Sequence, residues 1–96
     1  MPTPDPLPSD AELERRTAHR QAFGEVIRQA REQRGLSQEA LAERAEVSRP
    51  TIARIEGSTN TITLDRLWAL AYALETTATE LIARTELLVT RKRDAG

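Results

Sequence analysis

The side chains that could carry function in this sequence are arginines and hydroxyls, because the usual catalytic and metal-binding types are nearly missing. The chain has one histidine, His19, and no cysteine. It has no glycine-rich phosphate loop and no cluster of carboxylates at metal-ligand spacing. Nothing remains from which to assemble an active site or a metal site. We therefore expect no enzyme activity, no metal and no cofactor.

A short segment, Ser48-Arg49-Pro50-Thr51, combines hydrogen-bonding and apolar groups, and Arg54 follows it closely. An arginine such as Arg49 can donate two hydrogen bonds to O6 and N7 of guanine, which gives about 1–3 kcal/mol of discrimination between bases. A threonine can hydrogen-bond a base or contact the thymine methyl group, whereas a proline offers only apolar contact. The chemistry of this segment suits contact with base edges in the major groove of DNA.

Two short helices joined by a tight turn are expected to position this segment. Ser37 and Ser48 each suit a helix N-cap, and they predict helices over 38–45 and about 49–56. Pro50 is compatible with the first turn of a helix, where no amide donor is needed. This is the helix-turn-helix arrangement, in which the start of the second helix projects from the surface. The residues expected to pack inward are Leu41, Ala42, Ala45, Val47, Ile52 and Ile55.

Three more helices are expected to complete an all-α, compact five-helix domain. A capping box at 9–12 opens a helix that runs to about Gln33, Thr63 opens one that reaches about Leu74, and a capping box at 77–80 opens the last. Apolar residues recur at helical spacing in each helix, as expected for helices that share one core. Those expected inside are Phe23, Val26, Ile27 and Ala30, then Leu64, Leu67, Leu70, Ala71 and Leu74, and finally Leu81 and Ile82.

The two ends of the chain differ from this domain. Prolines at alternate positions predict a disordered arm over residues 1–9, followed by the helix-turn-helix domain over residues 10–84. Residues 85–96 form a C-terminal extension in which the segment Glu86-Leu87-Leu88-Val89-Thr90 either lengthens the last helix or forms a short strand. This extension is one candidate dimerisation element. Trp68 and Tyr72 lie off the main apolar stripe of their helix, so they belong to the periphery of the core or to a dimer contact.

Charge is distributed unevenly along the chain, although the formal net charge is only −1. Residues 1–14 carry four acids and no base, residues 15–57 carry an excess of three positive charges, and residues 58–96 are balanced. The basic excess falls in the segment with the paired helices, but it is small. We therefore expect modest non-specific affinity for DNA and a shallow salt dependence.

The sequence also predicts a location in the cell. No apolar run reaches the ~18–20 residues needed to span a membrane. The N-terminus lacks the basic and apolar pattern of a signal peptide. A cytoplasmic protein with no membrane partner is expected.

The paired helices resemble a known family. The segments Leu36-Ser37-Gln38-Glu39-Ala40-Leu41-Ala42, Val47-Ser48-Arg49 and Ile52-Ala53-Arg54-Ile55-Glu56 resemble the Cro/C1-type (Xre) helix-turn-helix family, which includes the lambda-type phage repressors. The resemblance covers about residues 20–83. It implies a lambda-repressor-like domain that binds double-stranded DNA, usually as a dimer on a two-fold operator. On this basis we expect a sequence-specific transcriptional regulator, a repressor or autoregulator, acting as a homodimer.

The resemblance also implies a role for each matching residue. Contact with bases is expected from the exposed positions of the recognition helix, which are Arg49, Pro50, Thr51 and Arg54. Contact with the DNA backbone is expected from Gln38, Ser48, Ser58, Thr59, Asn60, Thr61 and Arg31. Gln38 would also brace the recognition helix. Arg31 and Glu56 would form an ion pair between helices.

Three positions depart from the family pattern. Glu46 and Glu75 stand where the family often has glycine, and at a positive φ a glutamate costs roughly 1 kcal/mol relative to glycine. The loop after Glu56 lacks the basic residues that the family often has there. The first two departures affect stability, whereas the third affects affinity for DNA.

Two other functions remain open at this stage. The chain could be an antitoxin that masks a toxin protein and autoregulates its operon, with the apolar segment 87–89 and the N-terminal arm as its grip. It could also be a scaffold domain that kept the fold and lost DNA binding, which the acidic N-terminus and weak net charge favour. A partner that co-purifies, or an absence of DNA binding at low salt, would distinguish these alternatives.

Overall fold

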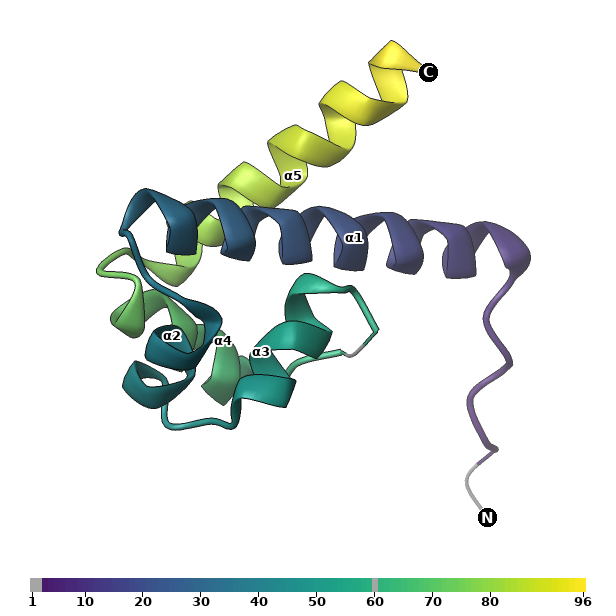
Figure 1. Cartoon of the computed structure of the whole chain (residues 1–96). Helices are drawn as coiled ribbons and strands as arrows, with labels where there is room; N and C mark the ends of the chain where they lie inside the picture. Colours follow the sequence, from purple (N-terminus) through teal and green to yellow (C-terminus); the bar gives the residue numbers. More distant parts are fainter. Residues whose placement is uncertain (1–2, 60) are drawn as a thin grey trace.

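The computed structural model describes residues 3–59 and 61–96 of the chain. These residues form five α-helices and no strand (Figure 1). The helices are α1 (Asp10–Gln33), α2 (Gln38–Arg44), α3 (Arg49–Glu56), α4 (Leu64–Ala73) and α5 (Ala78–Ala95). The expected all-α, five-helix architecture is confirmed. Among the described residues, no helix is both long enough and apolar enough to cross a membrane.

Each helix begins at a serine or threonine, which explains why the starts of all five could be read from the sequence. The capping oxygen accepts a hydrogen bond from the amide three residues later, at 3.0–3.2 Å. The caps are Ser9, Ser37, Ser48, Thr63 and Thr77. In the first capping box, the Glu12 carboxylate accepts hydrogen bonds from Arg15 and Arg16. These hydrogen bonds lower the pKa of Glu12.

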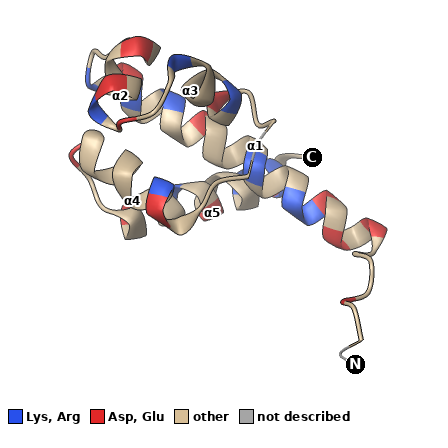
Figure 2. Ribbon diagram, turned by 90° about the horizontal axis from the view of Figure 1, so that it is seen from below, with Lys and Arg blue, Asp and Glu red and all other residues tan. Residues whose placement is uncertain are grey.

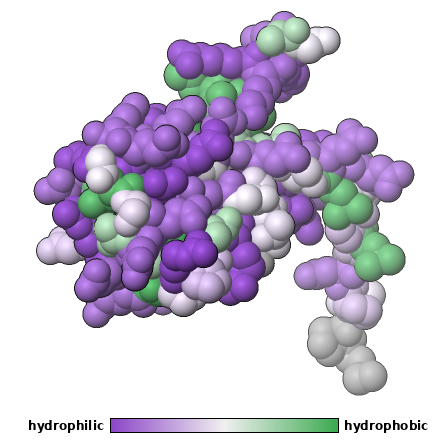
Figure 3. Space-filling model, viewed as in Figure 1, coloured by the Kyte–Doolittle hydropathy of each residue, from purple (hydrophilic) through white to green (hydrophobic). Residues whose placement is uncertain are grey.

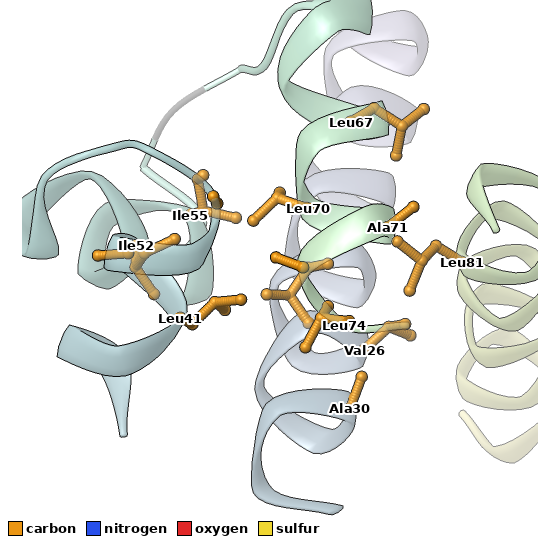
Figure 4. Packing of buried hydrophobic residues seen from close by; sticks show 14 residues of the cluster. Val26, Ala30, Leu41, Ile52, Ile55, Leu67, Leu70, Ala71, Leu74 and Leu81 are labelled. Atoms are coloured by element: carbon orange, nitrogen blue, oxygen red, sulfur yellow. The ribbon is translucent and has the colours of Figure 1, made fainter. Parts of the chain in front are cut away.

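The core lies where α2 and α3 meet α1, α4 and α5. Side chains from the helix-turn-helix point toward those of α4, and α1 and α5 close the cluster from the other side (Figure 4). Burial of this apolar surface is the main stabilising contribution in a domain of this size. The largest fully buried side chains are Ile27, Leu41, Ile52, Leu70, Leu74, Leu81 and Val26.

Two residues expected inside the core are exposed. Leu64 is 66% exposed because it opens α4 at the edge of the domain, and Ile82 is 39% exposed. Successive residues of a helix point about 100° apart, so the burial of Leu81 turns Ile82 outward. Trp68 and Tyr72 are also exposed, at 57% and 86%, and do not belong to the core.

The C-terminal extension is helical. Helix α5 runs without a break from Ala78 to Ala95, so the short strand considered above does not form, and the expected boundary at residue 84 falls inside a helix. Leu88 packs against the core, and the Lys92 ammonium lies 2.8 Å from the carboxylate of Glu25 on α1. The second half of α5 projects beyond α1 (Figure 1).

Gly24 lets α1 approach α3 closely. A Cβ atom at this position would lie 2.5 Å from the carbonyl oxygen of Ile55, 2.8 Å from that of Glu56 and 3.0 Å from Oγ of Ser58. Two of these atoms are backbone, which cannot rotate away. The glycine therefore sets the distance between α1 and the end of α3.

Replacing Gly24 with alanine is expected to destabilise the domain by about 1–3 kcal/mol, because the added methyl group must push α1 and α3 apart. Urea denaturation followed by circular dichroism would measure this change. Gln21→Ala, on an exposed position of the same helix, is the control. In an open helix the Gly24 substitution would stabilise by about 0.5–1 kcal/mol, so a gain in stability would refute close packing here.

Among residues 3–59 and 61–96, three residues other than glycine have a left-handed backbone. Glu46 has φ 57°, Glu75 has φ 56° and Ser58 has φ 66°. The two glutamates stand where glycine was expected, so each carries the steric cost of a Cβ atom in this conformation. Glu75 gains compensation from Arg34, which donates to its carboxylate at 2.6 Å and to its carbonyl oxygen at 3.1 Å.

Glu46→Gly is expected to stabilise the domain by about 0.5–1 kcal/mol, because it removes strain from the turn between α2 and α3. Glu75→Gly should gain less, since it also removes the contact with Arg34. Thermal unfolding of the two variants beside the unmodified protein checks the order. Equal gains would mean that the Arg34 contact contributes nothing.

Candidate nucleic-acid interface

Helices α2 and α3 form a helix-turn-helix whose turn is tightly fixed. The amide of Val47 donates to the carbonyl of Ala42 at 2.9 Å, and the left-handed backbone of Glu46 reverses the chain between the helices. Leu41 on α2 and Ile52 on α3 are both fully buried. The two helices are therefore held as a unit on the core, with the start of α3 at the surface.

Three of the four residues expected to contact bases are exposed. Arg49 and Pro50 open α3, and Arg54 lies on its outer face more than one turn later. This arrangement presents two guanidinium groups and one apolar ring on the same short helix. Such a surface can offer hydrogen-bond donors to base edges or phosphates.

Thr51 differs from the expectation that it is exposed. It is 9% exposed, and its hydroxyl lies 2.8 Å from Oγ of Ser48. Thr51 is the third residue of α3, where its side chain turns back toward the cap and lies on the same face as Ile52 and Ile55. Its hydroxyl and its amide both hydrogen-bond Oγ of Ser48, so Thr51 completes the cap of α3.

A chain of hydrogen bonds connects Arg49 to the interior. Nη1 of Arg49 donates to Oε1 of Gln38 at 3.1 Å, and Nε2 of Gln38 donates to Oε1 of Glu56, also at 3.1 Å. Glu56 in turn accepts from Nε and Nη2 of Arg31 at 2.7 and 3.0 Å. Arg31 also donates to the carbonyl of Leu36 at 2.8 Å. This series of hydrogen bonds connects α1, α2 and both ends of α3.

The partners of Gln38 determine the orientation of its amide. Arginine can only donate and an ionised carboxylate can only accept, so the Gln38 oxygen must face Arg49 and its nitrogen must face Glu56. The amide nitrogen carries a second N–H, which can donate to a phosphate. Gln38 can therefore brace Arg49 and contact the DNA backbone at the same time.

The ion pair at the base of this chain is largely buried. The side chains of Arg31 and Glu56 are only 13% and 5% exposed. The hydrogen bonds to Glu56 raise the pKa of Arg31, against the opposing effect of burial. A buried pair with two matched hydrogen bonds is sensitive to the loss of either partner, because the remaining charge is left without compensation.

Glu56→Gln is expected to destabilise the domain by about 3 kcal/mol, because it leaves the buried guanidinium of Arg31 without a counter-charge. Urea denaturation at neutral pH would measure the loss. Glu25→Gln is the matched control, since the Glu25–Lys92 pair is more exposed and should contribute less than about 1 kcal/mol. A loss below 1 kcal/mol for Glu56→Gln would show that the buried pair does not hold the helices together.

The loop after α3 carries the remaining hydroxyls. Thr59 and Thr61 are exposed, whereas Ser58 is half-buried against α1. Thr59 is fixed to the end of α3, since its amide and its hydroxyl both donate to the carbonyl of Arg54, at 3.0 and 3.2 Å. Asn60, also expected to contact the backbone, lies outside the described residues.

Acids and bases are interspersed on the helix-turn-helix surface. Seen from below, both α2 and α3 carry basic and acidic residues (Figure 2). The field over this surface is therefore weak, as the charge count suggests. No group of acids or histidines within the described residues could hold a metal ion.

Comparison with known proteins identifies the family. A family model described as helix-turn-helix matches residues 27–81, which is more than half of the chain. The chain belongs to the helix-turn-helix family of the Cro/C1 type. Members of this family are DNA-binding transcription regulators, and this chain is one of them.

Solved structures agree with this assignment. The restriction-modification controller protein C.AhdI from Aeromonas hydrophila is 33% identical, with a TM-score of 0.66 over 67% of this chain and 97% of that one. The hypothetical transcription factor NHTF from Neisseria is 28% identical, with a TM-score of 0.63 over 82% of this chain and 84% of that one. The clp gene regulator ClgR from Corynebacterium glutamicum, at 20% identity, shows the same fold, with a TM-score of 0.77 over 96% and 86%. No curated protein matches the sequence.

The structure also shows two residues, Gly24 and Arg34, whose positioning roles the sequence did not predict; Gly24 lies against the end of α3, and Arg34 lies at the turn before α5. Gly24 sets the distance between α1 and the end of α3. The sequence signal for this close contact is a glycine that stands among buried positions of a helix. Arg34 joins the end of α1 to the strained turn at Glu75. This contact joins residues 41 positions apart, which local patterns cannot reveal.

Proposed function

We propose that this helix-turn-helix protein is a sequence-specific repressor or autoregulator that binds a pseudo-palindromic operator as a homodimer. Arg49 reads a base in the major groove, most favourably guanine, and Pro50 and Arg54 contact the DNA beside it. Gln38, Ser48 and the loop over 58–61 contact the backbone. Two recognition helices then lie about one helical turn of DNA apart, ~34 Å, on one face of the duplex.

The observation that carries this proposal is the hydrogen-bonded position of Arg49. A free arginine side chain has about 2 kcal/mol of rotamer entropy to lose on binding. Here Gln38 holds the guanidinium at the exposed start of α3, and the buried Arg31–Glu56 pair holds Gln38. A pre-ordered guanidinium loses less entropy on binding, which supports a role in recognition.

Arg31 is largely buried, so its main role is to support the surface of α3 rather than to contact DNA. Its guanidinium already donates to Glu56 and to the carbonyl of Leu36, and the side chain is 13% exposed. Arg31 therefore supports the interface from below, and any contact with a phosphate is secondary to this role.

Arg49→Ala is expected to reduce the preference for the operator over random DNA by about 5- to 150-fold, the equivalent of the ~1–3 kcal/mol of a bidentate contact with guanine. The operator is first obtained by selecting bound sequences from random DNA. Gel retardation then compares both DNAs at one fixed salt concentration.

Arg91→Ala is the matched control, since Arg91 is exposed on α5, far along the chain from the recognition helix. Its loss removes the same charge and should leave the preference unchanged. If Arg49→Ala also leaves the preference unchanged while weakening binding to both DNAs, Arg49 contacts a phosphate and the base-reading assignment fails.

A second candidate function is that of an antitoxin, which binds a toxin protein and also regulates its own operon. The exposure of Leu7 and Leu87, at 93% and 51%, favours it because both lie in the segments expected to grip a partner. Leu7→Ser together with Leu87→Ser would release a co-purifying partner without touching the core. Retention of such a partner by the double variant would exclude these contacts.

A further inference from the structure

A hollow of about 540 Å³ lies where α1, α4 and α5 meet beside the end of α3. Its walls are mainly apolar, and the buried core residues Ile55 and Leu67 belong to them. Leu64 and Ile82, the two residues expected in the core but exposed, both line it. Binding sites for small molecules usually have volumes of about 300–1,000 Å³ and mostly apolar walls. The hollow therefore has the size and the lining of a ligand site.

Apolar surface of this kind is local on the molecule. Most of the face seen in Figure 3 is hydrophilic, apart from the projecting part of α5 and a few scattered side chains. A molecule that filled the hollow would remove both Leu64 and Ile82 from water. The free energy gained in this way grows with the apolar area covered.

Arg20 on α1 lines the same hollow and is half-buried. No carboxylate within the described residues forms an ion pair with it, whereas each of the other arginines inside α1 pairs with a glutamate, namely Arg15, Arg16, Arg28 and Arg31. A guanidinium can donate two parallel hydrogen bonds to a carboxylate. The unpaired cation beside an apolar cavity therefore suits a ligand that carries one carboxylate on an apolar body.

We propose that this hollow binds a small monocarboxylic acid with an aliphatic chain. The carboxylate accepts hydrogen bonds from the guanidinium of Arg20, and the chain packs among Phe23, Leu64 and Ile82. The inference goes beyond the proposed function, because the residues that hold the ligand are not those assigned to DNA. The site is nevertheless next to the loop after α3, since Thr61 and Ile62 also line it.

One acid, Glu86, also lines the hollow. Glu86 and His19 are both exposed, and both also line a neighbouring hollow between α1 and the projecting half of α5, so this acid lies at the edge of the site. Charges that are partly removed from water are screened less than exposed ones. Half-buried Arg20 should therefore outweigh exposed Glu86, and the site should prefer an anion to a cation.

Three probes with the same apolar chain test this preference: decanoate, decan-1-ol and decyltrimethylammonium. Isothermal titration calorimetry of the full chain, below the concentrations at which the probes form micelles, measures their dissociation constants. Decanoate should bind about tenfold more tightly than decan-1-ol, because it adds charged hydrogen bonds to the same apolar contacts. Equal affinities for these two probes, or tightest binding of the cation, would overturn the proposal.

Arg20→Gln should remove the preference for the acid. Decanoate should then bind about tenfold more weakly, while the affinity for decan-1-ol stays the same. Glu86→Gln should strengthen decanoate binding instead, since it removes a nearby like charge. Arg84→Gln is the matched control, because Arg84 is also half-buried but does not line the hollow. An equal loss for Arg20→Gln and Arg84→Gln would mean that only the overall charge matters, against a site at Arg20.

The position of the aliphatic chain is tested at the rim of the hollow. Leu64→Ser and Ile82→Ser should each weaken decanoate and decan-1-ol several-fold, because both residues contact the chain. Both positions are exposed, so circular dichroism should show an intact fold. Leu87→Ser, on an exposed part of α5 outside the hollow, is the control. Unchanged affinities in both rim variants would place the chain elsewhere and refute the inference.

A second copy of the chain is the competing occupant of this apolar surface. The proposal requires one decanoate per chain, with an affinity that does not depend on protein concentration. An affinity that falls as the protein concentration rises would show that another copy covers the hollow, and would overturn the inference. Amide shifts in NMR spectra that are confined to the surroundings of Trp68 and Tyr72 would do the same. All these measurements are made without DNA, so their outcome is independent of the proposed recognition of an operator.

Discussion

The ion pair between Arg31 and Glu56 is the interaction on which the proposed DNA-binding surface depends. It joins the long helix α1 to the last residue of the recognition helix, and Gln38 extends it through α2 to the first residue of that helix. Both charges are largely removed from water, so their matched hydrogen bonds are needed to offset the cost of desolvation. A pair of this kind favours one relative placement of the helices, and that placement brings Arg49 to the surface.

The same arrangement of the helices requires a close backbone contact at one position and unfavourable backbone conformations at two others. Position 24 must be a glycine, because a side chain there would collide with the backbone at the end of α3 and keep α1 away from it. Glu46 and Glu75 adopt a conformation better suited to glycine, in the turns that begin α3 and α5. Arg34 offsets part of the second cost, whereas no ion pair within the described residues offsets the first. The two backbone strains are similar, and the one in the turn of the helix-turn-helix is the less compensated.

Local signals explain how much of this fold could be predicted. The caps at Ser48 and Thr77 identify helix starts because they act within four residues, and the Arg31–Glu56 pair followed from the family resemblance. The burial of Thr51 could not be predicted in this way, since it depends on the angle at which α3 meets the core. The course of α5 past residue 85 was equally undetermined, because Leu88 contributes to the helix by packing on a distant part of the chain.

The weak charge of the interface places a constraint on how this protein can recognise DNA. Affinity from phosphate neutralisation grows with the number of cations, and here acids and bases are interspersed on α2 and α3. Non-specific binding should therefore contribute little, and a larger share of the binding energy must come from contacts made only at the right sequence. In the proposed mode of binding, the hydrogen bond from Arg49 to Gln38 favours such contacts, because a guanidinium already held in place loses less entropy when it meets a correct base. A second recognition helix on the same duplex would add to this specific contribution, so a balanced surface charge and a two-fold assembly support the same mode of recognition.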